Sequence, residues 1–373
     1  MNWPESASLL APLAAWFDRN RRTLPWRAED LSKPHPDPYA VLVSELMLQQ
    51  TQVATVIPYF QRWMEGFPDA ATLARADADA LHKAWEGLGY YRRARHLQAA
   101  AQKIAEHGWP ADLEGLLTLP GLGPYTAAAV ASIAFQQPEA ALDGNAFRVL
   151  ARVLGLEDDP TRHAKSLRHW LKPALETLGP SRLTQAVMEL GALVCTPSPR
   201  CEQCPLAACC EARRMDATER IPLKKDRAPQ KESEIWLLAI RAQGRWLLRP
   251  PASKGLLAGL WSWPVLPLEK PVANLAAEPQ QPFGLESWRS WPGWTQVYSH
   301  RKERIQPLAL EWSEAFPVAQ LRWVEEETLR TLPMGKRDQR LRELLDTSSQ
   351  GLEAPPIARL LRRLSSMEAG ELV

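Results

Sequence analysis

All five cysteines of this chain lie within sixteen consecutive residues, and this clustering constrains the fold more than any other feature. Cys195, Cys201, Cys204 and Cys210 are spaced C-x5-C-x2-C-x5-C, and Cys209 is left over. Four thiolates this close in sequence suit a zinc ion or a [4Fe–4S] cluster. Two disulfides are the alternative, disfavoured because the N-terminus lacks the basic and apolar regions of a secretory signal. Zinc sites usually have two C-x2-C pairs, so one pair with two longer arms favours iron–sulfur.

The length and composition indicate an ordinary globular protein with more than one domain. The chain has 373 residues, of which 45% are hydrophobic and 24% charged, enough for two separate cores. No apolar run reaches the roughly 18 residues of a transmembrane helix, so we expect a cytoplasmic protein without a membrane segment. A formal net charge of +2 does not by itself indicate nucleic acid, and any DNA contact must come from local patches.

The hydrophobic pattern changes character after the cysteines. Residues 1 to about 194 show helical periodicity without alternation, and helices are predicted at 39–50, 51–66, 77–87, 91–107, 146–154, 165–178, 181–194 and from Pro124 onward. Residues 212–234 are polar and read as a linker. Strands are then predicted at 235–241, 245–249, 259–263, 295–299, 305–312 and 322–324, with helices at 336–345 and 356–364. The second half is therefore predicted to be a separate α+β domain.

One acidic residue stands on an apolar helix face. At helical spacing Glu45 shares a face with Val41, Leu42 and Leu48. Burial there would raise its pKa, which suits a general acid. The alternative is an imperfect face from which Glu45 reaches solvent.

A second acidic residue, Asp143, comes directly before a predicted helix. N-capping by Asp143 or Asn145 explains this position well. A catalytic Asp143 would need another carboxylate nearby in space, and Glu45 is the candidate. Two carboxylates with pKa values pushed apart can cleave a glycosidic bond through an oxocarbenium-like state.

Several further segments are suited to DNA. In the Gly121-Leu-Gly123 turn, glycines allow close backbone approach and the next helix offers free N–H groups to a phosphate; a simple helix–helix turn is the alternative. The Gly87–Tyr91 loop supplies Leu88 and Tyr90, with tyrosine as a possible wedge. Three more candidates lie at the end of the Glu45 helix: Gln49, Gln50 and Thr51. They could form hydrogen bonds with base edges, and the alternative is that they are ordinary surface residues.

Arginines follow the Gly87–Tyr91 loop directly. Arg92, Arg93 and Arg95 could hold DNA phosphates. A solvated basic helix face is the alternative.

In this order, the motifs resemble the endonuclease III superfamily of DNA glycosylases, and within it the MutY adenine DNA glycosylases. The matching segments are 44–60, 87–91, 119–123, 142–145 and the cysteine loop. The resemblance covers residues 5–230 strongly and 235–345 more loosely. It implies a [4Fe–4S] cluster on Cys195, Cys201, Cys204 and Cys210, and a target base flipped into a cleft between two helical subdomains.

The resemblance also implies a role for each candidate site residue. Glu45 would protonate adenine at N7, and Asp143, held by Asn145, would stabilise the sugar cation. Tyr125 stands where lyase-competent relatives carry a Schiff-base lysine, which implies a glycosylase without lyase activity. Gln50 and Tyr90 match residues that contact, or wedge beside, 8-oxoguanine in the opposite strand.

The second domain resembles the family's C-terminal, Nudix-related domain, but it has no Glu-rich Nudix box, so diphosphate hydrolysis is not expected. Ser299 and His300 match a Phe-Ser-His turn that senses 8-oxoguanine, with Tyr298 in place of phenylalanine. Two other departures are a first cysteine arm one residue short and Pro124, which removes an N–H from the glycine turn.

We therefore expect a mainly α fold: a two-subdomain helix-hairpin-helix glycosylase domain with a cluster loop, followed by a smaller α+β Nudix-like domain. The boundaries predicted are 1–211 for the catalytic domain (six-helix barrel about 30–140, cluster part about 1–29 and 141–211), 212–234 for the linker, 235–346 for the Nudix-like domain and 347–373 for the tail. The expected partner is double-stranded DNA with 8-oxoguanine:adenine or guanine:adenine mispairs, bound by a monomer in the cytoplasm at the bacterial nucleoid.

Three alternatives are carried alongside this prediction. An endonuclease III-like glycosylase/lyase for oxidised pyrimidines is disfavoured by Tyr125 and the extra domain. A non-catalytic iron–sulfur DNA-binding module would leave Glu45 and Asp143 structural. A Nudix phosphohydrolase is disfavoured by the missing box.

Overall fold

A computed structural model gives the fold, and it describes residues 3–223, 230–252, 255, 257–267, 285–298, 301–315 and 320–347. Backbone contacts divide the chain into two compact units. The first contains Met1–Ala76 and Arg92–Asp226, and the second contains Asp77–Tyr91 and Arg227–Val373. Among the described helices, none is long and apolar enough to cross a membrane.

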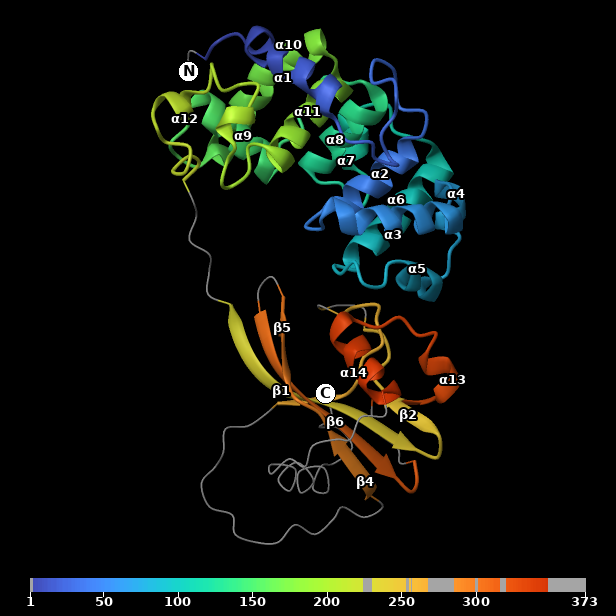
Figure 1. Ribbon diagram of the computed structural model, residues 1–373. Coiled ribbons are helices and arrows are strands. Elements are labelled where there is room, and N and C mark those ends of the chain that lie inside the picture. Colours follow the sequence, from blue (N-terminus) through green and yellow to red (C-terminus); the bar gives the residue numbers. More distant parts are fainter. Residues whose placement is uncertain are drawn as a thin grey trace. The chain divides into compact units, whose positions relative to one another are not determined.

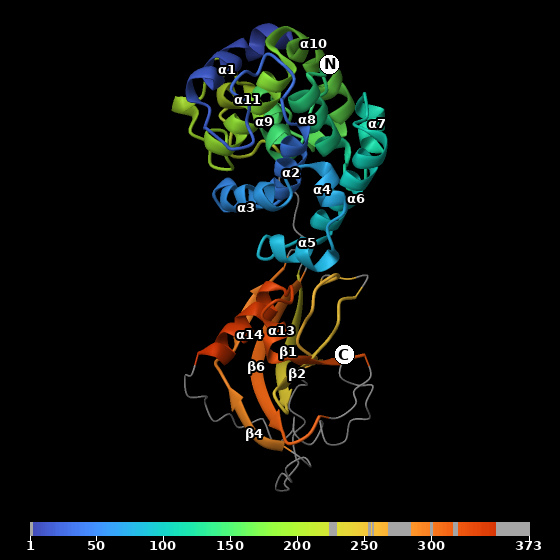
Figure 2. The same ribbon diagram turned by 90° about the vertical axis from the view of Figure 1, so that its right-hand side faces the viewer.

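The first unit is helical, as the sequence predicts (Figures 1 and 2). Its α-helices are α1 (Ser6–Asn20), α2 (Pro38–Leu48), α3 (Val53–Gly66), α4 (Ala70–Ala74), α6 (Arg92–His107), α7 (Leu113–Leu117), α8 (Pro124–Phe135), α9 (Gly144–Leu154), α10 (Ala164–Leu178), α11 (Pro180–Leu193) and α12 (Glu211–Arg214). Short 3₁₀ turns lie at Pro160–His163 and Cys201–Gln203.

Helix α2 begins as its sequence predicts. The Asp37 side chain accepts a hydrogen bond from the backbone N–H of Ala40, and Pro38 occupies the first turn, an arrangement that satisfies an otherwise unpaired N–H. The next helix, predicted from residue 51, begins at Val53 instead. Gln52 is its N-cap residue and makes no side-chain bond there, and the Thr51 hydroxyl donates to the carbonyl of Gln49.

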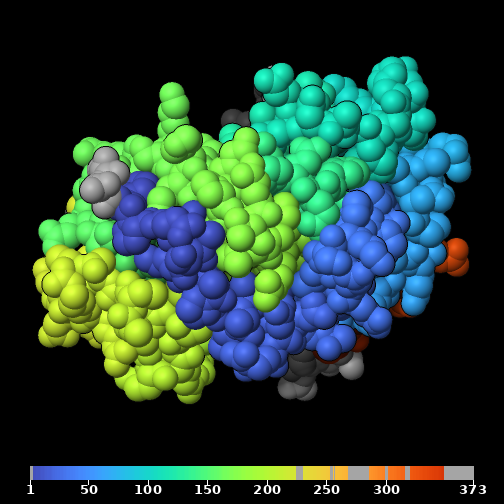
Figure 3. Space-filling model, turned by 90° about the horizontal axis from the view of Figure 1, so that it is seen from above, coloured from blue at the N-terminus to red at the C-terminus, as the bar shows by residue number. Residues whose placement is uncertain are grey.

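Helix α1, which the sequence analysis did not single out, packs on helices more than 140 residues away. Leu10, Leu13 and Phe17 share one hydrophobic core with Leu171 of α10 and Leu183 of α11. Figure 3 shows the dark-blue N-terminal segment lying against the yellow-green one that contains α11. This core also includes Cys195, so the cysteine loop is part of the same packed body.

The second unit is built on a mixed sheet, with α5 (Ala78–Ala84) from the helical part of the sequence. Its other elements are β1 (Lys231–Ala242), β2 (Arg245–Leu248), β3 (Val265–Pro267), β4 (Leu285–Ser290), β5 (Trp294–Val297), β6 (Arg301–Trp312), β7 (Arg322–Glu325), α13 (Glu326–Leu329) and α14 (Lys336–Asp346). The strand order is β4-β6-β1-β2-β7, with β3 paired to β1 and β5 to β6. Strands β1 and β6 run parallel.

Alternation along β1 builds a core on each face of the sheet. Trp236 and Leu238 pack on one face. Leu237 packs on the other, together with Trp263 and with Leu341 of α14, the helix that Figure 1 shows beside the sheet.

One strand prediction in this unit is wrong, and one strand was not predicted. Residues 259–263 do not form a strand: the chain turns, and Trp261 and Ser262 make only isolated bridges. The strand begins further on, at Val265. Strand β4 was not predicted, because Leu285–Ser290 lacks a clean alternation of apolar residues. The helix predicted at 356–364 lies outside the described residues.

A buried ionic network ties α14 to β6. Glu303, Arg337 and Asp338 are 3%, 4% and 0% exposed. Arg337 lies 3.4 Å from the Glu303 carboxylate and 3.2 Å from that of Asp338, and Asp338 also accepts the backbone N–H of Trp263 at 2.9 Å. Burial raises the pKa of Asp338 and the Arg337 charge opposes this.

We expect Arg337→Met to destabilise the second unit by about 3–5 kcal/mol, because the Asp338 carboxylate would stay buried without its cation and Glu303 would keep only its ion pair with Arg301. Urea denaturation of the full chain, followed by tryptophan fluorescence, measures this. Arg330→Met removes an exposed arginine and should change the unfolding free energy by less than about 0.5 kcal/mol. Equal stability of the two variants would show that the network contributes nothing.

Candidate active site

The first unit contains a cavity lined by residues from α2, α8 and the start of α9. Glu45, Tyr125, Asp143 and Asn145 all line it. These are the four catalytic candidates, brought together from positions up to 100 residues apart. Gln49, Gln50 and Thr51 also border this space.

Glu45 is buried and hard to ionise. It is 6% exposed, and burial raises its pKa to about 7, an effect that a hydrogen bond from Tyr125 partly offsets and the nearby Asp143 charge increases. Burial, together with the charges of Glu45 and Asp143, raises the pKa of Tyr125 well above its usual value. At neutral pH a substantial fraction of Glu45 is therefore protonated.

Asp143 is both a helix cap and a member of the cavity wall. Its Oδ1 accepts the backbone N–H of Ala146 at 2.7 Å, and Oδ2 lies 3.3 Å from Nδ2 of Asn145. The two interpretations of Asp143 are thus compatible, since capping uses one oxygen and holds the other toward Asn145.

Asn145 is held in turn by Arg148. The Arg148 Nη2 donates to Oδ1 of Asn145 at 2.9 Å and to the carbonyl of Gly191 at 2.8 Å. Its Nε donates to the carbonyl of Cys195 at 2.8 Å. A chain of hydrogen bonds therefore links Asp143 to the backbone of the first cysteine.

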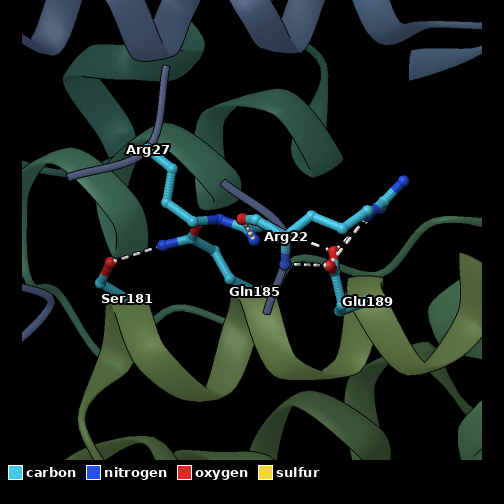
Figure 4. A network of polar contacts seen from close by, with 5 residues as sticks. All are labelled: Arg22, Arg27, Ser181, Gln185 and Glu189. Carbon is cyan, nitrogen blue, oxygen red and sulfur yellow. Dashed lines mark hydrogen bonds and ion pairs between the residues drawn. The ribbon is translucent and has the colours of Figure 1, made fainter. Parts of the chain in front are cut away.

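A polar network that the sequence analysis missed forms another part of the wall (Figure 4). Arg22, Arg27 and Gln185 line the cavity, and Glu189 of α11 holds both arginines, at 2.9 Å and 3.2 Å. Gln185 accepts from Nε of Arg27 at 2.8 Å and donates to Ser181 at 3.0 Å. The signal that marked Glu45 applies here too, because Glu189 is a carboxylate on an apolar helix face.

Glu189 is 1% exposed but ionised. Burial alone would raise its pKa, but hydrogen bonds from the side chain and backbone of Arg22, together with the charge of Arg27, hold it at about 2. Glu45, which lines the cavity, is therefore partly protonated at neutral pH, whereas Glu189, which holds the arginines of the wall, is ionised.

The other DNA-contact candidates fall into three places. Gln49 donates to Thr126 at 3.2 Å, and Gln50 has a left-handed backbone with φ of 56°. Tyr90 is 44% exposed while Leu88 is buried, and both belong to the second unit. Ser299 and His300 lie outside the described residues.

The cysteines line a second cavity of the first unit. Cys195, Cys201, Cys204 and Cys210 all border it, and every thiol is free. Burial, together with the neighbouring Cys195, Cys210 and Cys201, raises the pKa of Cys204 to about 11. Cys209 contacts the carbonyl of Leu206 at 3.4 Å instead. No group of three or more His, Cys, Asp or Glu side chains among the described residues is arranged to hold a single metal ion.

Comparison with known proteins identifies both parts of the chain. Residues 43–173 match the HhH-GPD superfamily of base excision DNA repair proteins, and residues 235–344 match the NUDIX domain. The chain is 34% identical to the adenine DNA glycosylase of Homo sapiens, over 88% of this chain and 72% of the human protein. The chain belongs to the adenine DNA glycosylase family. The predicted combination of a helix-hairpin-helix glycosylase fold and a Nudix-like domain is thereby confirmed.

Other adenine DNA glycosylases match in the same way. The one from Rattus norvegicus is 37% identical over 69% of this chain and 60% of its own length. The one from Mycolicibacterium smegmatis is 43% identical over 53% of this chain and 67% of its own length. The protein is a base excision repair enzyme that hydrolyses N-glycosyl bonds.

In this glycosylase, the helix-hairpin-helix turn lies between α7 and α8. Gly121 has φ of 82°, and a Cβ there would lie 2.4 Å from Cβ of His96. Gly123 is the N-cap residue of α8 with φ of −80°, followed by Pro124 in the first turn. Position 121 thus requires glycine, because its φ is positive and His96 leaves no room for a Cβ. At position 123 an added Cβ would have no atom within 4 Å.

We expect Gly121→Ala to destabilise the helical unit by about 1–3 kcal/mol, because alanine is strained at positive φ and meets His96. Gly123→Ala is the matched control and should cost less than about 1 kcal/mol, since no atom lies within 4 Å of its added Cβ. Thermal denaturation of both variants compares them, and equal losses would refute the steric argument.

Proposed function

We propose that this glycosylase removes adenine paired with 8-oxoguanine, and more slowly adenine paired with guanine, from double-stranded DNA. The observation that carries the proposal is Glu45, a buried carboxyl group with a pKa of about 7 in a cavity that it shares with Asp143. An acid of this strength can protonate a leaving group at physiological pH. We also expect the enzyme to act as a monomer, in the cytoplasm at the nucleoid.

The reaction starts with proton transfer from the Glu45 carboxyl group to N7 of the flipped adenine. Protonation lets the base leave with the electrons of the glycosidic bond, and the sugar becomes an oxocarbenium-like cation. The carboxylate of Asp143, fixed by the Ala146 N–H and by Asn145, stabilises this cation. Water then adds to C1′ and gives its proton to the Glu45 carboxylate, which completes hydrolysis, restores the acid and leaves an abasic site.

Tyr125 supports the absence of lyase activity. A phenol whose pKa lies well above the usual value stays protonated, and it has no amine to form a Schiff base with the sugar. Its hydrogen bond to Glu45 orients the acid.

The base would be held by the polar wall of the same cavity. Arg22, Arg27 and Gln185 supply donors and acceptors at fixed positions, because Glu189 and Ser181 hold their side chains. An adenine edge also presents both donors and acceptors. For the opposite strand, we propose contacts from Gln50 in the first unit and from Tyr90, Ser299 and His300 in the second.

A [4Fe–4S] cluster fits the donor set of the cysteine cavity. Cys195, Cys201, Cys204 and Cys210 would each bind one iron, and thiolates on four different irons stand further apart than ligands of a single ion. When bound, the cluster would cross-link the loop between α11 and α12. Arg152 adds a hydrogen bond to Sγ of Cys195 at 3.4 Å.

We expect Glu45→Gln and Asp143→Asn each to reduce base release by at least about a thousandfold, because one removes the acid and the other the charge facing the cation. Single-turnover assays on the 8-oxoguanine:adenine duplex measure this. Because the acid form of Glu45 is the active one and its pKa is raised to about 7, the wild-type rate should fall as pH rises through about 7.

Binding of the same duplex separates chemistry from DNA affinity in these variants. Both should bind with a Kd within about threefold of wild type, since neither change removes a cation from the DNA surface. Near-normal turnover by either variant would contradict the mechanism.

We expect Cys210→Ser to lose iron and Cys209→Ser to keep it, because Cys210 lines the cysteine cavity and Cys209 is turned to Leu206. Iron and acid-labile sulfide per chain are the quantities to measure after purification without oxygen. Iron loss from Cys209→Ser with retention in Cys210→Ser would reverse the ligand assignment.

A further inference from the structure

Arg93 is one of three arginines for which the sequence left two interpretations open, a phosphate ligand or part of a solvated basic helix face. The structure separates it from its neighbours. Arg93 is 7% exposed, whereas Arg92, one residue earlier on α6, is exposed. A guanidinium buried to this degree is poorly placed to meet a phosphate from solution.

The Arg93 side chain is directed at the C-terminal end of α2. Its Nη1 donates to the carbonyls of Leu46 at 2.9 Å, Met47 at 2.9 Å and Gln49 at 2.5 Å. Nη1 and Nη2 also reach Oγ1 of Thr51, at 3.4 Å and 3.3 Å. One guanidinium thus bonds four acceptors within six residues.

The acceptors at this end have no partner within their own helix. The last carbonyls of any α-helix lack intrahelical donors, and a cation there also interacts favourably with the helix dipole. In α2 the chain must in addition turn through Gln50, whose left-handed φ of 56° is unfavourable for a non-glycine residue. Arg93 binds the backbone on one side of that residue and a side chain on the other.

This end of α2 carries the cavity wall. Glu45 precedes Leu46, the first residue that Arg93 holds, and Gln49, Gln50 and Thr51 border the same cavity. Without the hydrogen bonds from Arg93 to these carbonyls, the last turn of α2 could shift and would move the Glu45 carboxyl group with it. A displacement of about 1 Å at a reacting group can cost roughly a hundredfold in rate.

We propose that Arg93 is a positioning residue: it locks the C-terminal turn of α2 and so fixes both Glu45 and the Gln49–Thr51 rim for base release. The proposal rests on the role proposed above for Glu45. It differs from a phosphate-binding role in what it predicts for DNA affinity. A phosphate contact contributes to the salt dependence of binding, and a buried positioning residue does not.

The experiment compares Arg93→Met with Arg92→Met in the full-length enzyme. Arg92→Met removes the same charge from the same helix without removing any bond to α2, so it is the matched charge control. Two quantities are measured for each: the single-turnover rate of adenine release at saturating enzyme, and the Kd for a duplex with a non-hydrolysable adenine nucleotide at several salt concentrations.

Arg93→Met should release adenine at least about tenfold more slowly than Arg92→Met. Its Kd should stay within about threefold of wild type, and the slope of log Kd against log salt should be unchanged. Arg93→Lys should give an intermediate rate, because an ammonium keeps the charge but lacks the planar fork that spans the carbonyls and Thr51. If Arg93→Met fails to fold, Arg93→Lys carries the test.

Two results would overturn the inference. In the first, Arg93→Lys releases adenine at the wild-type rate and Arg93→Met at the rate of Arg92→Met. If Arg93→Met does not fold, a wild-type rate for Arg93→Lys is enough. The other is a loss confined to Kd with a salt slope reduced by about 1, which is the signature of a phosphate contact. Glu45→Gln, assayed alongside, separates the two hypotheses. If it loses activity while the Arg93 variants do not, only the positioning role fails, and if it stays active, the proposed mechanism itself fails.

Discussion

The burial of Glu45 within α2 is the constraint on which the proposed catalytic site depends. Nine of the eleven residues of α2, from Tyr39 to Met47, are buried, so its one carboxyl group sits in a helix surrounded by protein. Ionising an acid there is costly, so the pKa of Glu45 is raised to about 7, although a hydrogen bond from Tyr125 opposes part of the rise. The same burial that weakens the acid makes it useful at neutral pH.

A second buried carboxyl group, which holds the arginines of the cavity wall, has the opposite protonation state at neutral pH. Glu189 is more buried than Glu45, yet it stays ionised because Arg22 and Arg27 donate to it. Environment, and not residue type, therefore makes one carboxyl group hold its proton up to about pH 7 and keeps the other as a fixed anion. The Glu189 anion in turn holds Arg22 and Arg27 in fixed orientations along the cavity wall.

The sequence reveals some of these features and hides others, for a physical reason. Glu45 and Asp143 are visible because each contradicts or completes a local helix pattern. Helix starts such as Asp37-Pro38 are equally local. The contacts of Glu189 with Arg22 join residues 167 positions apart, and the hydrophobic periodicity of the sequence cannot predict such a pairing. The sequence makes Arg93 a candidate phosphate ligand or part of a solvated helix face, because its charge is visible there and its burial against α2 is not.

The central claim is that this enzyme releases adenine, fastest opposite 8-oxoguanine, without cutting the strand. Single-turnover incubation with three duplexes tests it: adenine opposite 8-oxoguanine, adenine opposite guanine, and an oxidised pyrimidine opposite a purine, each analysed with and without hot alkali. The account predicts strand breaks only after alkali, and fastest opposite 8-oxoguanine. Breaks without alkali on the oxidised pyrimidine would contradict it and would require a lyase amine in place of Tyr125.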